Sequence, residues 1–413
     1  MIALAVCLWL MISYADKLSE EMEKKETETP PEEPRKKGVA MDSFSYYLPT
    51  KIYFERGGLE RYLPLVKNYG TKALVVTGRK SVYESGLLGR IRAILAEHEI
   101  PCAVFSEVDP EPSVENVEAG ARVCRAEGCD VLVGVGGGSP MDVAKGVAVL
   151  AANPGSLKDY FGEVEYPHRP RPVICVPTTC GTASEVTRYA VIVVRDEQTK
   201  KTVSSEEIIP RAAILDAQLL ATLPTRLVAA TGMDALCHAV EGALSRKNRA
   251  VTGMFARESV RVLHRSLPRA ASGRDDDLDG REEVLYGSLL AGFVINHTGT
   301  IMVHGMAYSL TIKYGAHHGT ANALLLPYVL EYLKSRGYAA EIEPLEGIWG
   351  GRDRLRSFIQ DLGLPLRLRD LGVSEGDLPE LAVLAEKGCA RAVLNMKVTP
   401  SPDDYRRILN EAY

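Results

Sequence analysis

The sequence predicts an α/β fold in two parts: an N-terminal part built on a parallel sheet, and an all-α C-terminal part. Two observations carry this prediction. Short apolar strands alternate with helical segments up to about residue 223, as in proteins whose parallel strands are joined by crossover helices. After Pro224 the strand pattern nearly ends, and helical periodicity continues almost to Tyr413.

Composition limits the function classes. The 413 residues are 46% hydrophobic and 25% charged, which is ordinary for a globular chain of about two domains. The net charge of −5, from 49 basic and 54 acidic residues, argues against nucleic acid as a partner. The eight cysteines include no CxxC pair, which favours reduced, mostly buried thiols in a cytoplasmic protein.

The first forty residues differ from the rest. The apolar run 1–13 is far shorter than the ~20 residues of a membrane helix, so we expect no stable membrane insertion. No basic residue precedes the run and no A-x-A site follows it, which disfavours a secretory signal. Residues 16–38 are charged and Pro-rich, which predicts disorder. We therefore expect residues 1–40 to be a dispensable tail or an over-long start.

The N-terminal part, predicted as 41–223, opens with a strand-like aromatic and β-branched segment after Met41. Further strands are predicted at 73–78, 102–108, 130–137 and 172–179, with helices at 85–99 and 113–128. The C-terminal part, predicted as 224–413, is helical. A ligand is expected in the cleft between the two parts.

A glycine-rich turn follows the strand at 130–137. Gly136, Gly137 and Gly138 allow the backbone to approach an anion, and Ser139 and Pro140 suit the N-cap and first position of a helix over 141–152. Free N–H groups at such a helix start favour a pyrophosphate. The spacing is not the G-x-G-x-x-G of the Rossmann fingerprint, and a glycine-rich turn that binds nothing remains the alternative.

A second turn, 177–185, also follows a buried strand. Its small hydroxyl residues suit contacts to the phosphates or ring of a cofactor. The same residues also suit a helix start, with Thr182 and Glu185 forming a capping box.

Asp234 and His238 lie four residues apart in a predicted helix over 225–245, and so share one face. Asp234 stands among apolar and small residues, where an unpaired carboxylate would be costly. A divalent cation with imidazole ligands is the simplest compensation. One Asp with two or three neutral imidazoles suits Fe(II) or Zn(II).

Six of the eight histidines fall between 238 and 318. His297 and His304, seven apart, are predicted on one face of a further helix that ends near 314–315, and the pair 317–318 begins the next segment. Any one of these histidines could instead serve the core or a helix cap. We expect His264 to lie on an amphipathic surface. His98 and His168, the two histidines outside this range, are expected to be solvated.

Four blocks identify the chain by resemblance: GGGSPMDVAKG, PTTCGTASEVT, TGMDALCHAVEG and VHGMAYSLTIKYGAHHGTANALLLP. In this order and spacing they resemble the signature blocks of the iron-containing (group III) alcohol dehydrogenases. The resemblance covers about residues 44–413. It implies a Rossmann-like dinucleotide-binding domain and a helical metal-binding domain with the active site between them.

The resemblance also implies site residues. The metal ligands fall on Asp234, His238, His304 and His318, whereas His297 and His317 match no ligand position. The residues expected to bind cofactor are Gly78, Gly136, Gly137, Gly138, Ser139, Asp142, Thr178, Thr179 and Thr182. Tyr308 stands where some members carry a histidine suspected of relaying protons, so Tyr308 or water would pass the proton.

The implied activity is reversible hydride transfer between a primary alcohol or aldehyde and NAD(P), with Fe(II) bound and Zn(II) as the alternative. We expect a homodimer, the commonest oligomer. The strand at 73–78 ends in Gly78, where NAD-preferring members tend to carry an acidic residue, and Arg79 and Lys80 follow. We therefore expect NADP(H) to be preferred and NAD(H) still to be used.

Two other kinds of enzyme share the implied fold, dehydroquinate synthase-like lyases and glycerol dehydrogenase-like enzymes. The lyase requires many basic residues around its substrate, and the helices that would line the pocket lack them. A non-catalytic member is the third hypothesis. The complete ligand and glycine sets argue against it.

Overall fold

The computed structural model describes residues 43–197, 199–272 and 277–413. The predictions made for residues 1–40, including disorder, lie outside these residues. A six-stranded sheet in the order β1-β8-β5-β4-β2-β3 forms the base of the N-terminal part, and every strand pair in it is parallel. Its strands are β1 (Lys51–Phe54), β2 (Ala73–Gly78), β3 (Cys102–Val108), β4 (Val131–Gly136), β5 (Val173–Pro177) and β8 (Ala212–Leu215). The predicted parallel sheet is confirmed.

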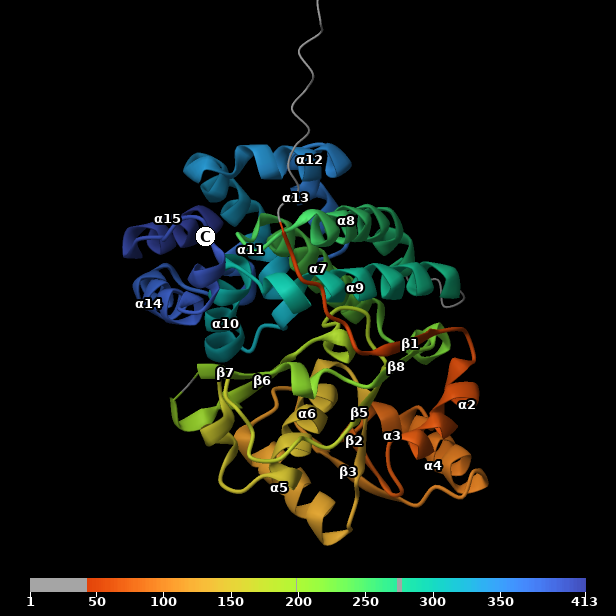
Figure 1. The fold of residues 1–413 in the computed structure, drawn as a ribbon. Coiled ribbons are helices and arrows are strands. Elements are labelled where there is room, and N and C mark those ends of the chain that lie inside the picture. Colours follow the sequence, from red (N-terminus) through yellow and green to blue (C-terminus); the bar gives the residue numbers. More distant parts are fainter. Residues whose placement is uncertain (1–42, 198, 273–276) are drawn as a thin grey trace, which may run out of the picture. The chain divides into compact units, whose positions relative to one another are not determined.

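Helices cover both faces of this sheet (Figure 1). Alternate residues of β2 point to opposite faces: Val75 packs in one apolar cluster, while Leu74 and Val76 pack in another. The helices on the first face include α4, and those on the second include α5 and α6. The helices of this part are α2 (Gly58–Tyr62), α3 (Ser81–Glu84), α4 (Leu87–Glu97), α5 (Val114–Ala126) and α6 (Gly138–Ala152). Burial on both faces explains the continuous apolar runs of the strands.

An antiparallel hairpin, β6 (Tyr189–Val194) and β7 (Thr199–Ser204), stands apart from the parallel sheet. The sequence analysis did not predict it. Every second residue of β6 is buried, whereas most of β7 is only partly buried, and its sequence TKKTVS carries little of the apolar signal of a strand. The hairpin contacts the N-terminal part through a bridge between Val193 and Ser113.

The C-terminal part is helical, as predicted. Its α-helices are α7 (Thr225–Leu244), α8 (Ala250–Ala270), α9 (Leu278–Thr298), α10 (Met302–Tyr314), α11 (His318–Leu333), α12 (Ala339–Trp349), α13 (Arg352–Asp361), α14 (Leu378–Cys389) and α15 (Pro402–Ala412). Helix α7 is buried along almost its whole length and packs against α8, α9 and α11. Asp234 and His238 therefore lie on a buried central helix.

Two local predictions about helix starts are wrong. Helix α6 begins at Gly138 with Gly137 as its N-cap, so Ser139 lies inside the first turn, where its hydroxyl donates to the carbonyl of Pro110 at 2.6 Å. No α-helix begins in the second turn: Ala183 has a φ of 50°, and only a 3-10 turn over Ser184–Val186 follows. The Thr182 hydroxyl accepts from the Ser184 N–H instead of capping a helix.

The single helix predicted to carry His297 and His304 is also wrong. Helix α9 ends at Thr298, Gly299 adopts a φ of 63°, and α10 begins at Met302. The axes of the two helices differ by 105°. His297 and His304 therefore lie on different elements.

Of the described helices, none alone has the length and apolar composition of a membrane span. The bent pair α9 and α10 passes that test only when its two members are taken together.

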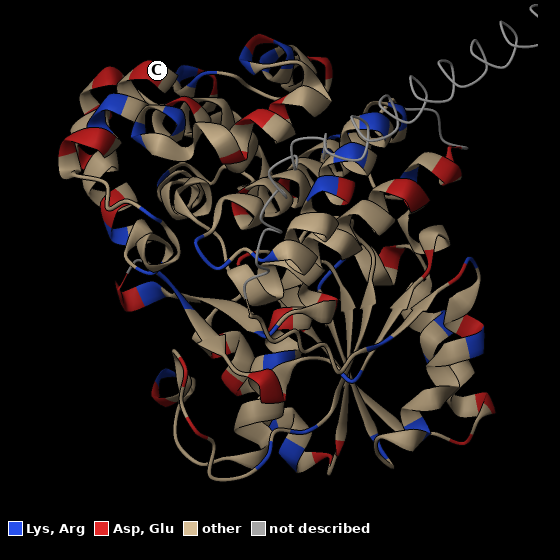
Figure 2. Cartoon of the chain, turned by 45° about the horizontal axis from the view of Figure 1, so that its top comes forward, with Lys and Arg blue, Asp and Glu red and all other residues tan. Residues whose placement is uncertain are grey.

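Charged residues lie mainly on the outer helices, and the strands of the sheet are almost free of them (Figure 2). Six of the seven described cysteines are buried: Cys124, Cys129, Cys175, Cys180, Cys237 and Cys389. All seven are free thiols, as the sequence predicts, and Cys102 is partly exposed.

Candidate metal and cofactor site

The structure brings the four predicted ligand residues together from three helices. Asp234 and His238 lie on α7, His304 on α10 and His318 at the start of α11. The ligand atoms of Asp234, His238 and His304 all lie within 4.8 Å of one another, and all three residues are buried. The Asp234 Oδ1 atom is 3.3 Å from His304 Nε2 and 3.9 Å from His318 Nε2.

Burial and charge set the protonation of this group. Burial lowers the pKa of His238 to about 4, and it holds the pKa of His318 well below its ordinary value. Burial alone would raise the pKa of Asp234, but the surrounding imidazoles outweigh it and lower that pKa. His238 and His318 are therefore neutral beside an ionised carboxylate, the forms in which these side chains bind metals.

Glu241, one turn beyond His238 on α7, organises the start of α10 and was not singled out from the sequence. Its Oε1 accepts the N–H of Ile301 at 3.1 Å, of Val303 at 2.7 Å and of His304 at 3.4 Å. Its Oε2 contacts His304 Nδ1. These are N–H groups that a helix start leaves without internal partners. Glu241 is fully buried in an apolar helix, so the reasoning applied to Asp234 would have found it.

The Glu241 contact fixes the orientation of His304. Because Nδ1 faces the carboxylate, Nδ1 carries a proton and Nε2 is turned toward Asp234. Burial alone would lower the pKa of His304, but the carboxylates of Glu241 and Asp234 outweigh it and raise the value to about 9.

His238 is oriented in the same way from the N-terminal part. Its Nδ1 lies 3.2 Å from the carbonyl oxygen of Gly181, which can only accept a hydrogen bond. Nδ1 is therefore the protonated nitrogen, and Nε2 is left for another partner. The second turn thus touches the imidazole directly.

Asn322, one turn after His318 on α11, is a further residue that the sequence analysis missed. It is fully buried, and its Nδ2 donates to Asp234 Oδ1 at 2.7 Å and lies 3.2 Å from His318 Nε2. This amide holds the carboxylate in place. A polar residue four positions after a candidate ligand was the available signal.

The residues present fit a divalent cation. Within the described part of the chain, His304 Nε2 and His318 Nδ1 are buried nitrogens without a hydrogen-bond partner. Buried polar groups are rarely left so, because each costs the desolvation free energy of the group. Three imidazoles and one carboxylate are ligands suited to Fe(II) and Zn(II).

The two predicted cofactor turns pack against each other. A Cβ atom added at Gly138 would lie 2.9 Å from Thr182 Cγ2, and one added at Gly137 would lie 3.4 Å from the Thr179 side chain. Gly136 has a φ of 138°, a conformation that L side chains rarely adopt. Glycine is therefore required where the backbone of the first turn meets the threonines of the second.

Asp142 and Lys145, on consecutive turns of α6, hold the second turn and the hairpin. The Asp142 carboxylate accepts from Ser184 Oγ at 2.6 Å and from the Val191 N–H at 2.9 Å. The Lys145 ammonium, with no exposed surface, donates to Ser184 Oγ at 2.8 Å and to the carbonyls of Thr187 and Tyr189. Asp142 was expected to contact cofactor, and here both of its oxygens bind protein groups.

Tyr308 lies beside the metal ligands. Its ring stacks on His318 with 5.4 Å between ring centroids. Lys200 of β7 places its ammonium 5.4 Å from the centre of that ring and pairs with Glu111 at 2.5 Å. Lys200 was not predicted, because the hairpin that positions it was not predicted.

The other histidines lie elsewhere. His297 accepts the Tyr47 N–H at 3.0 Å and stacks on Tyr46. His317 is exposed as the residue before α11, and His264 is half-buried against Phe358. His98 and His168 are exposed, as predicted.

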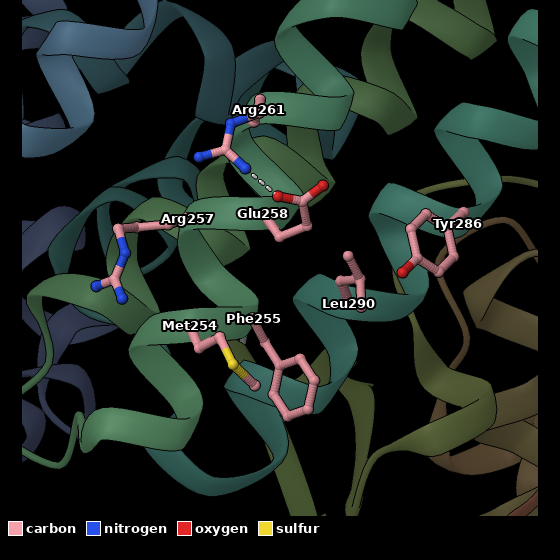
Figure 3. Close-up of a pocket in the computed structure, with 7 residues that line it drawn as sticks. All are labelled: Met254, Phe255, Arg257, Glu258, Arg261, Tyr286 and Leu290. Atoms are coloured by element: carbon pink, nitrogen blue, oxygen red, sulfur yellow. Dashed lines mark hydrogen bonds and ion pairs between the residues drawn. The ribbon is translucent and has the colours of Figure 1, made fainter.

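A hollow of about 360 Å³ opens between α8 and α9 (Figure 3). Met254, Phe255 and Leu290 supply its apolar lining, and Glu258 and Arg261 form an ion pair beside it. None of the predicted metal or cofactor residues lines it.

Comparison with known proteins covers most of the chain. The family model described as iron-containing alcohol dehydrogenase matches residues 49–217, and that of the C-terminal region of the Fe-containing alcohol dehydrogenase family matches residues 228–413.

Relatives agree with these matches. The chain is 38% identical over 333 residues to a 1,3-propanediol dehydrogenase of Klebsiella pneumoniae, covering 77% of this chain and 86% of that protein. It is 32% identical over 383 residues to alcohol dehydrogenase 4 of Schizosaccharomyces pombe, covering 90% of each.

A solved structure of a 1,3-propanediol oxidoreductase superposes with a TM-score of 0.84 at 34% identity, covering 90% of this chain and all of that one. The family implies a bound metal ion and a nicotinamide cofactor, and the lyase alternative is not supported. The chain belongs to the iron-containing alcohol dehydrogenase family and is an oxidoreductase acting on the CH–OH group of alcohols.

Proposed function

We propose that the chain interconverts a primary alcohol and its aldehyde with NADP(H), using Fe(II) held by Asp234, His238, His304 and His318. The observation that carries the metal assignment is the buried group of Asp234, His238 and His304, whose ligand atoms lie within 4.8 Å of one another. Zn(II) is the alternative ion, because these ligand types accept both.

A bound divalent cation supplies Lewis-acid polarisation of the substrate oxygen. The protein holds the ligands in a fixed orientation. Glu241 holds the Nδ1 proton of His304, and the Gly181 carbonyl holds that of His238, so both Nε2 atoms face the centre of the group. Asn322 holds the Asp234 carboxylate through Oδ1.

The two turns orient the cofactor. We assign the pyrophosphate to the N–H groups of Gly137, Gly138 and Ser139 at the start of α6, where the helix dipole favours negative charge. Thr178, Thr179 and Thr182 would contact the phosphates and the nicotinamide. Because Gly181 of this turn touches His238, the hydride donor and the substrate oxygen would be held next to each other.

Tyr308 is the proposed route by which a proton leaves the site. Its phenol stacks on His318 and can both donate and accept a hydrogen bond. Asp142 acts on the cofactor through the second turn, because both its oxygens bind Ser184 and Val191.

The metal assignment predicts the result of His304→Ala. Protein purified anaerobically should lose most of its metal and its turnover while keeping cofactor affinity, because the cofactor turns lie on other elements. Metal analysis, and absorbance at 340 nm with a panel of aldehydes and reduced cofactor, measure the two effects. His297→Ala is the matched control, since its imidazole binds Tyr47, and it should keep both metal and activity. Stoichiometric metal with full turnover in His304→Ala would overturn the assignment.

We also propose that the enzyme is a cytoplasmic homodimer. Sedimentation velocity of the metal-loaded protein tests the oligomeric state, and a monomer at micromolar concentration would contradict it.

A further inference from the structure

Two arginines from separate elements meet on one carboxylate beside the end of β2. Asp109 directly follows β3, whose last residue, Val108, pairs with Gly78 at the end of β2. Arg79 donates from Nε to Asp109 Oδ1 at 3.1 Å, and Arg195 donates from a terminal nitrogen to Oδ2 at 3.1 Å. Arg195 belongs to the 3-10 turn that joins β6 to β7.

The cluster keeps unused donors. Asp109 pairs with both guanidinium groups, and Glu115 Oε2 lies 3.9 Å from Arg195 Nε, so within the described residues Arg79 is the guanidinium with only the shared carboxylate beside it. A guanidinium has five N–H groups, and within the described residues Arg79 uses only its Nε, so its terminal nitrogens stay available. The side chains of Arg79 and Arg195 are 53% and 59% exposed, which leaves both open to a ligand.

Open space lies next to this cluster. A Cβ atom added at Gly78 would meet only the Val108 carbonyl oxygen, at 3.8 Å. The residue after Asp109 is tied to the glycine turn, because the Ser139 hydroxyl donates to the Pro110 carbonyl at 2.6 Å. The arginines therefore flank the same edge of the parallel sheet as the turn assigned to the pyrophosphate, where α/β sheets bind their ligands.

We propose that Arg79 and Arg195 together bind a phosphate ester on the adenosine ribose of the cofactor, and that Asp109 is the positioning residue that holds both guanidinium groups there. Planar guanidinium groups bind phosphate oxygens through paired hydrogen bonds. Arg195 would thus make the β6–β7 turn part of cofactor recognition. The inference rests on the proposed use of NADP(H).

The test compares two ligands that differ only in the 2′-phosphate. Calorimetric titration of the full chain with adenosine 2′,5′-bisphosphate and with 5′-AMP isolates the 2′-phosphate. We expect the wild-type protein to prefer the bisphosphate, and Arg195→Gln and Arg79→Gln each to reduce that preference about fivefold, the usual size of an exposed ion contact. Affinity for 5′-AMP should stay unchanged in both variants.

Controls separate charge from structure. Arg195→Lys keeps the charge and should keep most of the preference. Arg406→Gln removes an exposed arginine paired with Asp403 at 2.8 Å on α15, and it should change nothing. Raising the salt from about 0.1 M to about 1 M shortens the Debye length from about 10 Å to about 3 Å, so the wild-type preference should shrink.

The outcomes separate this inference from the proposed function. If Arg195→Gln kept the wild-type preference for the bisphosphate, Arg195 would have no role in binding the phosphate. Its ion pair with Asp109 would then only anchor the hairpin. A wild-type protein without any preference would overturn the phosphate site and the NADP(H) assignment. Aldehyde reduction with NADH, followed at 340 nm, would still establish the dehydrogenase in either case.

Discussion

At the residue scale, Glu241 links a helix start to a metal ligand, and Gln at this position separates those roles. In Glu241→Gln the amide oxygen can still accept the N–H groups at the start of α10. The amide nitrogen would meet the Nδ1 proton of His304 donor to donor and turn the imidazole proton toward Nε2. We expect a loss of metal affinity of about 10- to 100-fold, as for other partners of metal-bound histidines. Chelator competition measures it, and wild-type affinity would contradict the orienting role.

Gly78 is the second residue at which a single change is informative. Gly78→Asp adds a carboxylate in open space, where it can accept from a ribose 2′-hydroxyl and repel a 2′-phosphate. The ratio of kcat/KM for NADPH to that for NADH should exceed one in the wild type and fall about fivefold in the variant. A wild-type preference for NADH would refute the cofactor assignment.

At the element scale, one buried ammonium joins α6 to the second turn and the hairpin. Lys145→Met would leave the carbonyls of Thr187 and Tyr189 without their donor and the Asp142 carboxylate without the positive charge 3.9 Å away. Breaking a buried ionic group in this way costs about 3 kcal/mol of unfolding free energy. Urea unfolding should show that loss, together with a raised KM for cofactor. Lys158→Met removes an exposed lysine paired with Asp196, and it should leave both values within error.

The elements also show which parts of the fold could be predicted from the sequence. The bounds of β2, which is buried on both faces, and of the edge strand β3 were predicted to the residue, because runs of apolar residues are a local signal. The hairpin was not predicted, since β7 owes its strand conformation to pairing with β6 and not to its own residues. The break between α9 and α10 was missed because the seven-residue spacing of His297 and His304 was interpreted as one helix, although residues 296–300, NHTGT, interrupt the apolar pattern there.

In the candidate site, too, some residues could be predicted from the sequence and others could not. Asp234 and His238 could be paired by helical spacing alone. His304 and His318, 70 and 84 residues beyond Asp234 in the chain, join them only through packing, so the resemblance supplied what spacing could not. Glu241 and Asn322 each had a local signal in the sequence, but no local pattern identifies their partners on other elements, or those of Lys145.

At the scale of the whole molecule, the described residues after Ser43 pack into extended apolar clusters of their own. A chain starting at Met41 should therefore fold, bind metal and turn over like the full-length protein. Equal Tm and kcat for the two chains, measured side by side, would agree with this. Insolubility of the shorter chain, or membrane association of the longer one, would show that residues 1–40 have a function.

The buried thiols allow the local opening of the fold to be followed by chemical labelling. Burial raises the pKa of Cys124 and Cys180 to about 11 each, so at neutral pH only about one in ten thousand of these groups is a reactive thiolate. Cys124 lies under the parallel sheet and Cys180 lies against α7, so each reports on a different part of the fold. Among the described thiols, a disulfide reagent would therefore modify Cys102 first, and the later labelling of the two buried sites would record the rates at which these regions open.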